Sequence, residues 1–253
     1  MRVVQSFIIA LSMYSKIPMP RIRWQEENLK YVMCFFPVVG IIIGGLMYLI
    51  GMLLLGSSAS KLFFAGVMTL LPILISGGIH LDGFMDTIDA ISSHADREKK
   101  LMILKDSHAG AFAILGMGCY LVWNMAVWSE VTSNTLPILC CSYILSRGLS
   151  GWTIISFPAA RDSGLAKTFQ NAAHKNVVRG MMLFYIILAV NLMCLENMTL
   201  AGVAAIFSCI ICQWYRYICQ KQFGGVTGDL AGFFLQICEL GIQSAVVIAG
   251  YWL

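Results

Sequence analysis

The chain has 253 residues, of which 58% are hydrophobic and only 12% are charged, and its formal net charge is +4 at pH 7. Ordinary soluble domains are roughly 45–50% apolar and about 25% charged, so this chain has too few polar side chains to cover a soluble globule. The composition therefore excludes a soluble enzyme and predicts a single integral membrane domain over residues 1–253.

The first apolar segment, Phe7 to Tyr14, is too short to span a bilayer. Basic and proline residues follow it directly, whereas a cleaved signal peptide would need a positive start, a longer apolar core and a small-residue cleavage site. We expect a short helix that lies at the membrane interface or packs on the rest of the protein.

Seven further apolar stretches are long enough, or nearly so, to cross a hydrocarbon core of ~30 Å. They cover approximately residues 32–55, 61–79, 108–128, 135–157, 177–195, 198–219 and 230–252. The sequence therefore predicts an all-α, polytopic transmembrane bundle of about seven spans.

Lysine and arginine residues alternate from one connection to the next. They precede the first predicted span and return between spans two and three, between spans four and five, and near the end of span six, whereas the other connections carry only Lys61. Because cytoplasmic loops hold the excess of basic residues, the N-terminus and these loops are predicted to be cytoplasmic. The positive charge thus follows from topology, so we expect membrane lipid around the protein and no nucleic-acid partner.

The most informative motif, GGIHLDGFMDTIDA, runs from Gly77 to Ala90, where the second predicted span ends. Asp82, Asp86 and Asp89 are four and three residues apart, so a helix would place all three on one face. A divalent cation among them would offset their mutual repulsion by attracting all three carboxylates. Carboxylate oxygens are the ligands that Mg²⁺ and Mn²⁺ prefer. The spacing alone is equally consistent with an acidic loop at the end of a span.

Further polar motifs fall in loops that the charge pattern places on the same side of the membrane. Their candidate residues are Lys105, Asp106, Arg161, Gly225, Thr227 and Asp229. A glycine-rich turn before a helix, such as that from Gly224 to Asp229, exposes backbone N–H groups to which phosphate oxygens can bind. Taken alone, this turn is more typical of an ordinary loop between helices.

Charged side chains are expected to differ in burial. The run DREKK, Asp96 to Lys100, is typical of a solvated surface, whereas Asp106 directly precedes a span and is expected to be buried. Arg147 and Glu239 lie inside spans four and seven, where a charge costs about 3 kcal/mol on insertion scales and usually faces a partner or a cavity. A mutual ion pair and a place in the lining of a substrate cavity are both consistent with these positions.

The motif HLDGFMDTIDA resembles the signature of the cobalamin synthase family, the adenosylcobinamide-GDP ribazoletransferases. Other motifs follow in the family's order: SKIPMP from Ser15, FFPVVGIIIG from Phe35, REKKLMILKDSHAGAFA from Arg97, FPAARDSGLAKTF from Phe157 and GGVTGDLAG from Gly224. The resemblance covers nearly the whole chain. Positions that depart from the family's usual residues are Ala90, His108, Ala159 and Gln236, and the central carboxylates are intact.

The resemblance implies a Mg²⁺-dependent phosphotransferase, in which Mn²⁺ can replace Mg²⁺. The enzyme would transfer the adenosylcobinamide phosphoryl group from adenosylcobinamide-GDP to α-ribazole or α-ribazole 5′-phosphate, releasing GMP, in the late step of cobalamin nucleotide-loop assembly. It would be a multi-pass protein of the bacterial cytoplasmic (inner) membrane, with its active site facing the cytoplasm. A homo-oligomer, or a complex with other corrinoid-assembly enzymes, is left open.

The family pattern also implies roles for individual residues. The metal ligands would be Asp82, Asp86 and Asp89. The catalytic residues would be His80, Asp82, Asp86 and Asp106. Either His80 or Asp106 would orient or deprotonate the acceptor hydroxyl. The residues that bind substrate or phosphate would be Lys105, Arg161, Gly225, Thr227, Asp229 and Glu239.

Two other classes of membrane protein also carry clustered carboxylates and are the alternatives. A CDP-alcohol phosphotransferase also uses spaced aspartates at a membrane surface, but its motif continues from an Asp-Gly pair into Ala-Arg, whereas Asp82-Gly83 is followed here by Phe84-Met85-Asp86. A divalent-cation transporter would carry acidic or polar residues at mid-bilayer in several spans, and here the carboxylates gather on one side. Release of GMP or of CMP from the corresponding activated substrate distinguishes these classes.

Overall fold

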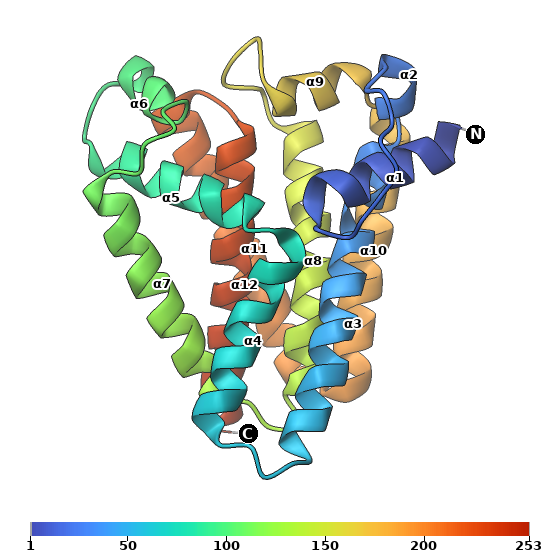
Figure 1. Ribbon diagram of the computed structural model, residues 1–253, viewed down its shortest axis with the longest axis vertical. Coiled ribbons are helices and arrows are strands. Elements are labelled where there is room, and N and C mark those ends of the chain that lie inside the picture. The colour runs from blue at the N-terminus through green and yellow to red at the C-terminus, as the bar shows by residue number, and fades with distance from the viewer. Residues whose placement is uncertain (1, 253) are drawn as a thin grey trace.

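In the computed structural model, which describes residues 2–252, the chain is a bundle of α-helices with no β-strand in that range (Figure 1). Six helical segments are long and apolar enough to cross a membrane, and the bent pair Lys61–Ser76 and Ile79–Ser92 brings the number to seven if it is counted as one span. The predicted all-α bundle of about seven spans is confirmed.

The crossing helices are α3 (Phe36–Leu55), α4 (Lys61–Ser76), α7 (Ala111–Ser129), α8 (Leu136–Ser156), α10 (Lys175–Glu196), α11 (Met198–Ile218) and α12 (Gly228–Gly250). Shorter helices lie near one end of the bundle: α1 (Arg2–Tyr14), α2 (Glu26–Leu29), α5 (Ile79–Ser92), α6 (Arg97–Ile103) and α9 (Leu165–Ala172). A 3₁₀ turn (Val32–Phe35) leads into α3, and a π-helical turn (Cys219–Phe223) extends α11.

Helices α8 and α12 form the centre of the bundle, since most of their residues are buried while the other crossing helices expose much of their surface. Small residues allow neighbouring helices to approach α8 closely. Gly40 and Gly44 of α3 lie against the backbone of α8 at Tyr143 and Cys140, where a Cβ atom would overlap a carbonyl oxygen. The core of the protein is therefore built around α8.

The bend between α4 and α5 sets the position of the acidic motif. Gly77 and Gly78 both have positive φ values, 70° and 77°, a backbone conformation that glycine adopts far more readily than other residues. These two residues end α4 and turn the chain by 98° into α5. Helix α5 consequently runs across the bundle rather than along it (Figure 1).

The loops that carry the predicted motifs all lie at the same end of the bundle (Figure 1). Helices α5, α6 and α9 and the turn before α12 lie at this end, whereas the α3–α4, α7–α8 and α10–α11 connections lie at the other. Helix α1 also lies at the motif-bearing end, where Ser6 donates a hydrogen bond to the carbonyl oxygen of Asn28 at 2.6 Å. The prediction of a short N-terminal helix packed on the bundle is therefore confirmed.

We expect the motif-bearing end to face the cytoplasm, because the basic loops lie there. Reporters that are active only in the cytoplasm should be active when fused within residues 97–105 or 161–175. The same reporters should be inactive when fused within 57–60 or 129–134, where an export-dependent reporter should be active instead. Placement of the α5–α6 region on the outer face would contradict both this orientation and the access of cytoplasmic nucleotides to the acidic motif.

Candidate functional site

The candidate site lies where α5 crosses the beginning of α12. A Cβ atom at Gly83 of α5 would lie 2.7 Å from the carbonyl oxygen of Asp229, and one at Gly232 of α12 would lie 2.9 Å from that of His80. Real Cβ atoms essentially never approach closer than 3.0 Å, so glycine at both positions permits this crossing. The backbones in contact bring the acidic face of α5 beside Asp229.

Four aspartates form what we call the acidic cluster: Asp82, Asp86, Asp89 and Asp229. Burial and the negative charge of the surrounding carboxylates raise the pKa of Asp86 to about 6. The contributing carboxylates are, in decreasing order, Asp82, Asp229, Asp89 and Asp106. The predicted acidic face of α5 is therefore present, and α12 adds a carboxylate to it.

Asp89 has a structural partner that distinguishes it from the rest of the acidic cluster. Its Oδ1 accepts a hydrogen bond from the backbone N–H of Ala113 at 3.3 Å, and its carboxylate lies directly against Gly110. Since Gly110 precedes α7 and offers no side chain, Asp89 supplies the cap that this helix terminus lacks. Among the described residues, Asp82 and Asp86 make no side-chain hydrogen bond or ion pair and are free to bind a ligand.

The acidic cluster is not a closed metal cage. Within residues 2–252, no three His, Cys, Asp or Glu side chains are arranged closely enough to hold a metal ion by themselves. The donor chemistry nevertheless fits Mg²⁺, which commonly binds through one or two carboxylates together with water and substrate phosphates. Asp82 and Asp86 therefore have the donor chemistry to supply two of the ligands of such an ion.

Arg161 supplies positive charge beside the acidic cluster. Its Nη2 lies 3.6 Å from Oδ2 of Asp229, and its buried Nε has no hydrogen-bond partner within residues 2–252. Two backbone hydrogen bonds hold its loop against the turn before α12, from Val226 to Pro158 at 2.8 Å and from Ala160 to Val226 at 3.0 Å. This pairing places Arg161 at the beginning of α12.

The turn before α12 is shaped by two of the predicted residues. Thr227 caps the helix, because its Oγ1 accepts a hydrogen bond from the backbone N–H of Leu230 at 3.1 Å. A Cβ atom at Gly225 would overlap the carbonyl oxygen of Pro158, so glycine is needed there for the two loops to pair. A cavity of about 230 Å³ adjoins this turn, with Arg161 and Thr227 in its lining.

The loop between α6 and α7 corrects one prediction about burial. Asp106 is exposed, because α7 begins only at Ala111 and the loop before it remains at the surface. Its carboxylate pairs with Nδ1 of His108 at 2.7 Å, and this hydrogen bond lowers the pKa of Asp106. Lys105 is likewise exposed. The expected burial of Asp106 is therefore wrong.

The charged run in α6 corrects a second prediction. Lys100 is buried and donates a hydrogen bond from Nζ to Oε1 of Gln222 at 2.8 Å, and Arg97 reaches the carbonyl oxygen of Ala160 at 3.4 Å. These residues join α6 to the π-helical turn and to the Arg161 loop. The run is solvated at Lys99 but not along its whole length.

His80 lies on the buried side of α5. Its ring stacks on that of Tyr14, with centroids 5.7 Å apart, and meets the ring of Phe36 at 5.6 Å. Burial, with a smaller contribution from the positive charge of Arg147, lowers the pKa of His80 to about 3. The imidazole is therefore neutral at physiological pH and a weak base.

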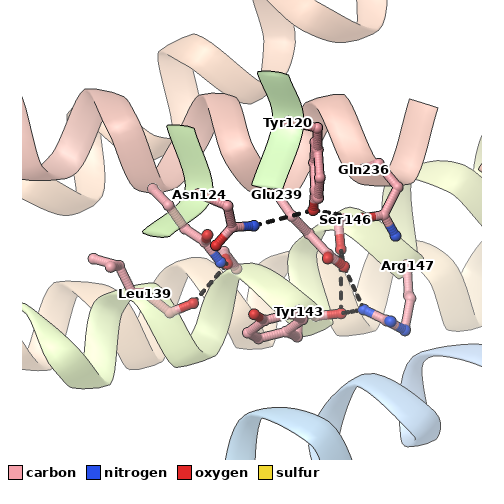
Figure 2. Close-up of polar contacts among 10 residues, drawn as sticks. Tyr120, Asn124, Leu139, Tyr143, Ser146, Arg147, Gln236 and Glu239 are labelled. Carbon is pink, nitrogen blue, oxygen red and sulfur yellow. Dashed lines mark hydrogen bonds and ion pairs between the residues drawn. The ribbon is translucent and has the colours of Figure 1, made fainter. Parts of the chain in front are cut away.

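A buried ion pair lies deeper in the bundle (Figure 2). Arg147 of α8 donates to Oε1 of Glu239 of α12 at 2.6 Å, and Ser146 donates to the same oxygen at 2.9 Å. Only 2% of the Arg147 side chain and 5% of the Glu239 side chain are exposed. The expectation of a mutual ion pair is confirmed, and the carboxylate of Glu239 is engaged within the core.

Known proteins are similar to this chain over almost its entire length. The model of the cobalamin-5-phosphate synthase family matches residues 6–247. The adenosylcobinamide-GDP ribazoletransferase of Lachnoclostridium phytofermentans is 43% identical, with 98% of this chain and 95% of the relative covered. The proteins of the same name from Clostridium perfringens and Carboxydothermus hydrogenoformans are 33% and 31% identical, with at least 91% of each chain covered. No solved structure matches.

The ion pair gives a prediction about stability. Glu239→Ala should lower the free energy of unfolding by roughly 3–5 kcal/mol, because it leaves the charge of Arg147 buried without its partner. The double variant Arg147→Met/Glu239→Leu should recover most of this loss. Unfolding of the purified protein in mixed detergent micelles measures both, and a double variant no more stable than Glu239→Ala would contradict the explanation.

Proposed function

The chain belongs to the cobalamin-5-phosphate synthase family, and we propose that it performs the family's transfer with the acidic cluster and Arg161 as the groups that handle the phosphates. Its relatives are named for the transfer between adenosylcobinamide-GDP and ribazole, so this chain is a transferase of cobalamin synthesis. The alternatives of a CDP-alcohol phosphotransferase and of a cation transporter are thereby set aside.

The chemistry is a displacement at a phosphorus atom of a pyrophosphate. A hydroxyl oxygen of the ribazole forms a new P–O bond to the adenosylcobinamide phosphate, the P–O bond to GMP breaks, and the hydroxyl proton is lost. Such reactions are accelerated chiefly by neutralising phosphate charge and by holding the attacking and leaving oxygens in line. The protein therefore needs positive charge and an oriented hydroxyl at one place.

The observation that carries the proposal is the meeting of opposite charges where α5 crosses α12. Asp82 and Asp86 carry carboxylates without side-chain partners among the described residues, while Arg161 lies beside Asp229 with its buried Nε unpaired. Arginine presents a planar fork of donors that matches two phosphate oxygens. A pyrophosphate bound here would contact Arg161 on one side and face the carboxylates on the other.

The helix terminus adds to this phosphate site. The first N–H groups of α12 have no partner within the helix and carry partial positive charge, which favours anions. The cavity of about 230 Å³ at this terminus is lined by Arg161, Lys167 and Thr227, among others. We assign the GDP phosphates to this cavity.

Asp82 and Asp86 would hold Mg²⁺, or Mn²⁺ in its place, with Asp229 as the neighbouring carboxylate. When bound, the ion would supply the charge neutralisation that two adjoining phosphates require. Asp89 contributes less to this task because it caps α7. Helix α5 fixes the two ligands relative to each other, one turn apart on the same face.

The proposed setting is the cytoplasmic membrane, with the site on the cytoplasmic face. It is supported by the basic residues of the loops around α5, α6 and α9 and by the position of these helices at one end of the bundle. GDP-activated substrates are cytoplasmic, so they would reach the site without crossing the bilayer.

The metal assignment predicts that replacing different aspartates by asparagine lowers kcat to different extents. Asp82→Asn and Asp86→Asn should each lower kcat by at least about 100-fold, since even residues that only support metal ligands contribute 10–100-fold. Asp89→Asn should retain far more activity, because the amide oxygen of asparagine can still accept the hydrogen bond from Ala113. Release of GMP by purified, folded variants is the measurement.

Chelation provides the matched test on the unaltered protein. EDTA should abolish GMP release, and added Mg²⁺ or Mn²⁺ should restore it. Full activity in EDTA, or in Asp82→Asn, would contradict the metal assignment.

The phosphate contact predicts a different kinetic effect. Arg161→Lys keeps the positive charge but loses the planar guanidinium that can bind two phosphate oxygens. KM for adenosylcobinamide-GDP should therefore rise by about 10–100-fold, as expected for the loss of a charge-assisted hydrogen bond. Lys99→Ala, in the exposed part of α6, should change nothing. An Arg161→Lys enzyme with wild-type KM would show that the phosphates bind elsewhere.

A further inference from the structure

A second, mostly apolar cavity lies on the inner side of the acidic cluster. Its volume is about 290 Å³, and it is enclosed by residues of α1, α3, α5, α8, α9 and α12. Aromatic side chains form part of the wall, namely Tyr14, Phe36 and Phe169. Asp82 and Asp229 also line it, so the cavity opens onto the acidic cluster.

Two residues that line this cavity carry a buried polar atom without a partner among the described residues. Nε2 of His80 and Oγ of Ser150 are buried without a hydrogen bond in the described structure, and the two residues are 5% and 1% exposed. A buried polar group left unpaired costs about 1–3 kcal/mol, so native proteins rarely retain one without a purpose. Serine in a helix can hydrogen-bond to a carbonyl of the preceding turn, and Ser150 does not do so.

The shape and chemistry of the cavity limit what can fill it. An engineered apolar cavity of ~150 Å³ holds benzene, and this cavity has about twice that volume, which suits two fused rings. The aromatic walls favour a flat, apolar ring system. Away from the carboxylates of Asp82 and Asp229, the described side chains of the lining offer the unpaired polar atoms of His80 and Ser150, so a base with one accepting nitrogen matches this wall better than guanine, whose edge carries many polar atoms.

We propose that this cavity binds the base of the acceptor nucleoside, an apolar aromatic bicycle with one nitrogen that accepts hydrogen bonds from both Ser150 and His80. Ribazole is a riboside of such a base, a benzimidazole, in which one ring nitrogen carries the ribose and the other is a free acceptor. The proposal rests on the transferase function proposed above.

This placement accounts for the position of the acceptor hydroxyl. With the base held in the cavity, the ribose lies toward the opening, where Asp82 and Asp229 are located. His80 is then a residue that binds the base, and its buried imidazole, whose Nε2 has no partner among the described residues, suits a hydrogen bond to a ring nitrogen. The adenosylcobinamide and GDP parts of the other substrate remain outside the cavity, near Arg161.

The test compares two acceptors that differ in the one nitrogen. Wild-type enzyme should prefer the riboside of dimethylbenzimidazole to that of dimethylindole, which lacks the accepting nitrogen, by about 10-fold or more in KM. Ser150→Ala and His80→Phe should each raise KM for the benzimidazole riboside, leave KM for the indole riboside little changed, and so reduce the preference. KM for adenosylcobinamide-GDP should stay the same.

The controls separate this inference from the proposed function and from misfolding. Ser208→Ala removes another buried serine, whose hydroxyl bonds only within α11 to Ala205, and should leave the preference intact. If His80→Phe does not fold, Ser150→Ala still decides, because its hydroxyl has no protein partner to lose. The base site would be overturned if Ser150→Ala kept the wild-type preference for the benzimidazole riboside, or if KM rose equally for both ribosides. GMP release by the wild-type enzyme would still uphold the transferase in that case. Absence of GMP release from wild-type enzyme would instead refute the transferase.

Discussion

The polar end of this protein depends on how closely α5 crosses α12. Gly83 and Gly232 let the two backbones touch where any side chain would hold them apart. As a result, the carboxylates of α5 lie beside Asp229, and the Arg161 loop, which pairs with the turn before α12, joins them. The crossing requires the bend at Gly77 and Gly78, because this bend turns α5 across the bundle.

This crossing concentrates charge in surroundings where charge is poorly screened. Carboxylates packed against an apolar bundle repel one another more strongly than they would in water. A pyrophosphate alone would add to that repulsion, so the arrangement requires compensating positive charge. Arg161, the beginning of α12 and a divalent ion are the sources that the site offers in the proposed mechanism. The mostly apolar cavity that opens onto the cluster is suited to an uncharged group.

The crossing helices were predictable because their signal is local. Apolar length alone marks each span, and the distribution of lysine and arginine places the polar loops together at one end. The acidic face of α5 was predictable for the same reason, since helical spacing is a local property. Gly83 carried a signal that is easily overlooked: glycine inside a helix costs about 1 kcal/mol relative to alanine, so its presence there is consistent with a packing requirement.

What could not be predicted depends on contacts between distant segments. The hydrogen bond from Lys100 to Gln222 buries part of a run that looks solvated, and Asp106 is exposed because α7 starts several residues beyond it. Likewise, spacing places Asp89 on the acidic face but does not reveal that the beginning of α7 lies against it. The sequence also leaves open whether Arg147 and Glu239 pair with each other, and only the packing of α8 on α12 brings them together.

The shortness of α4 has a consequence for the depth of the site. Its 16 residues, at a rise of ~1.5 Å each, span roughly 24 Å, which is less than a hydrocarbon core of ~30 Å. Such a mismatch is met by local thinning of the bilayer or by a helix end that remains below the headgroups. Helix α5 follows α4 immediately, so the carboxylates would sit at the level of the lipid headgroups rather than in open water. Large amphipathic substrates could then reach the site by moving along the membrane surface, in two dimensions.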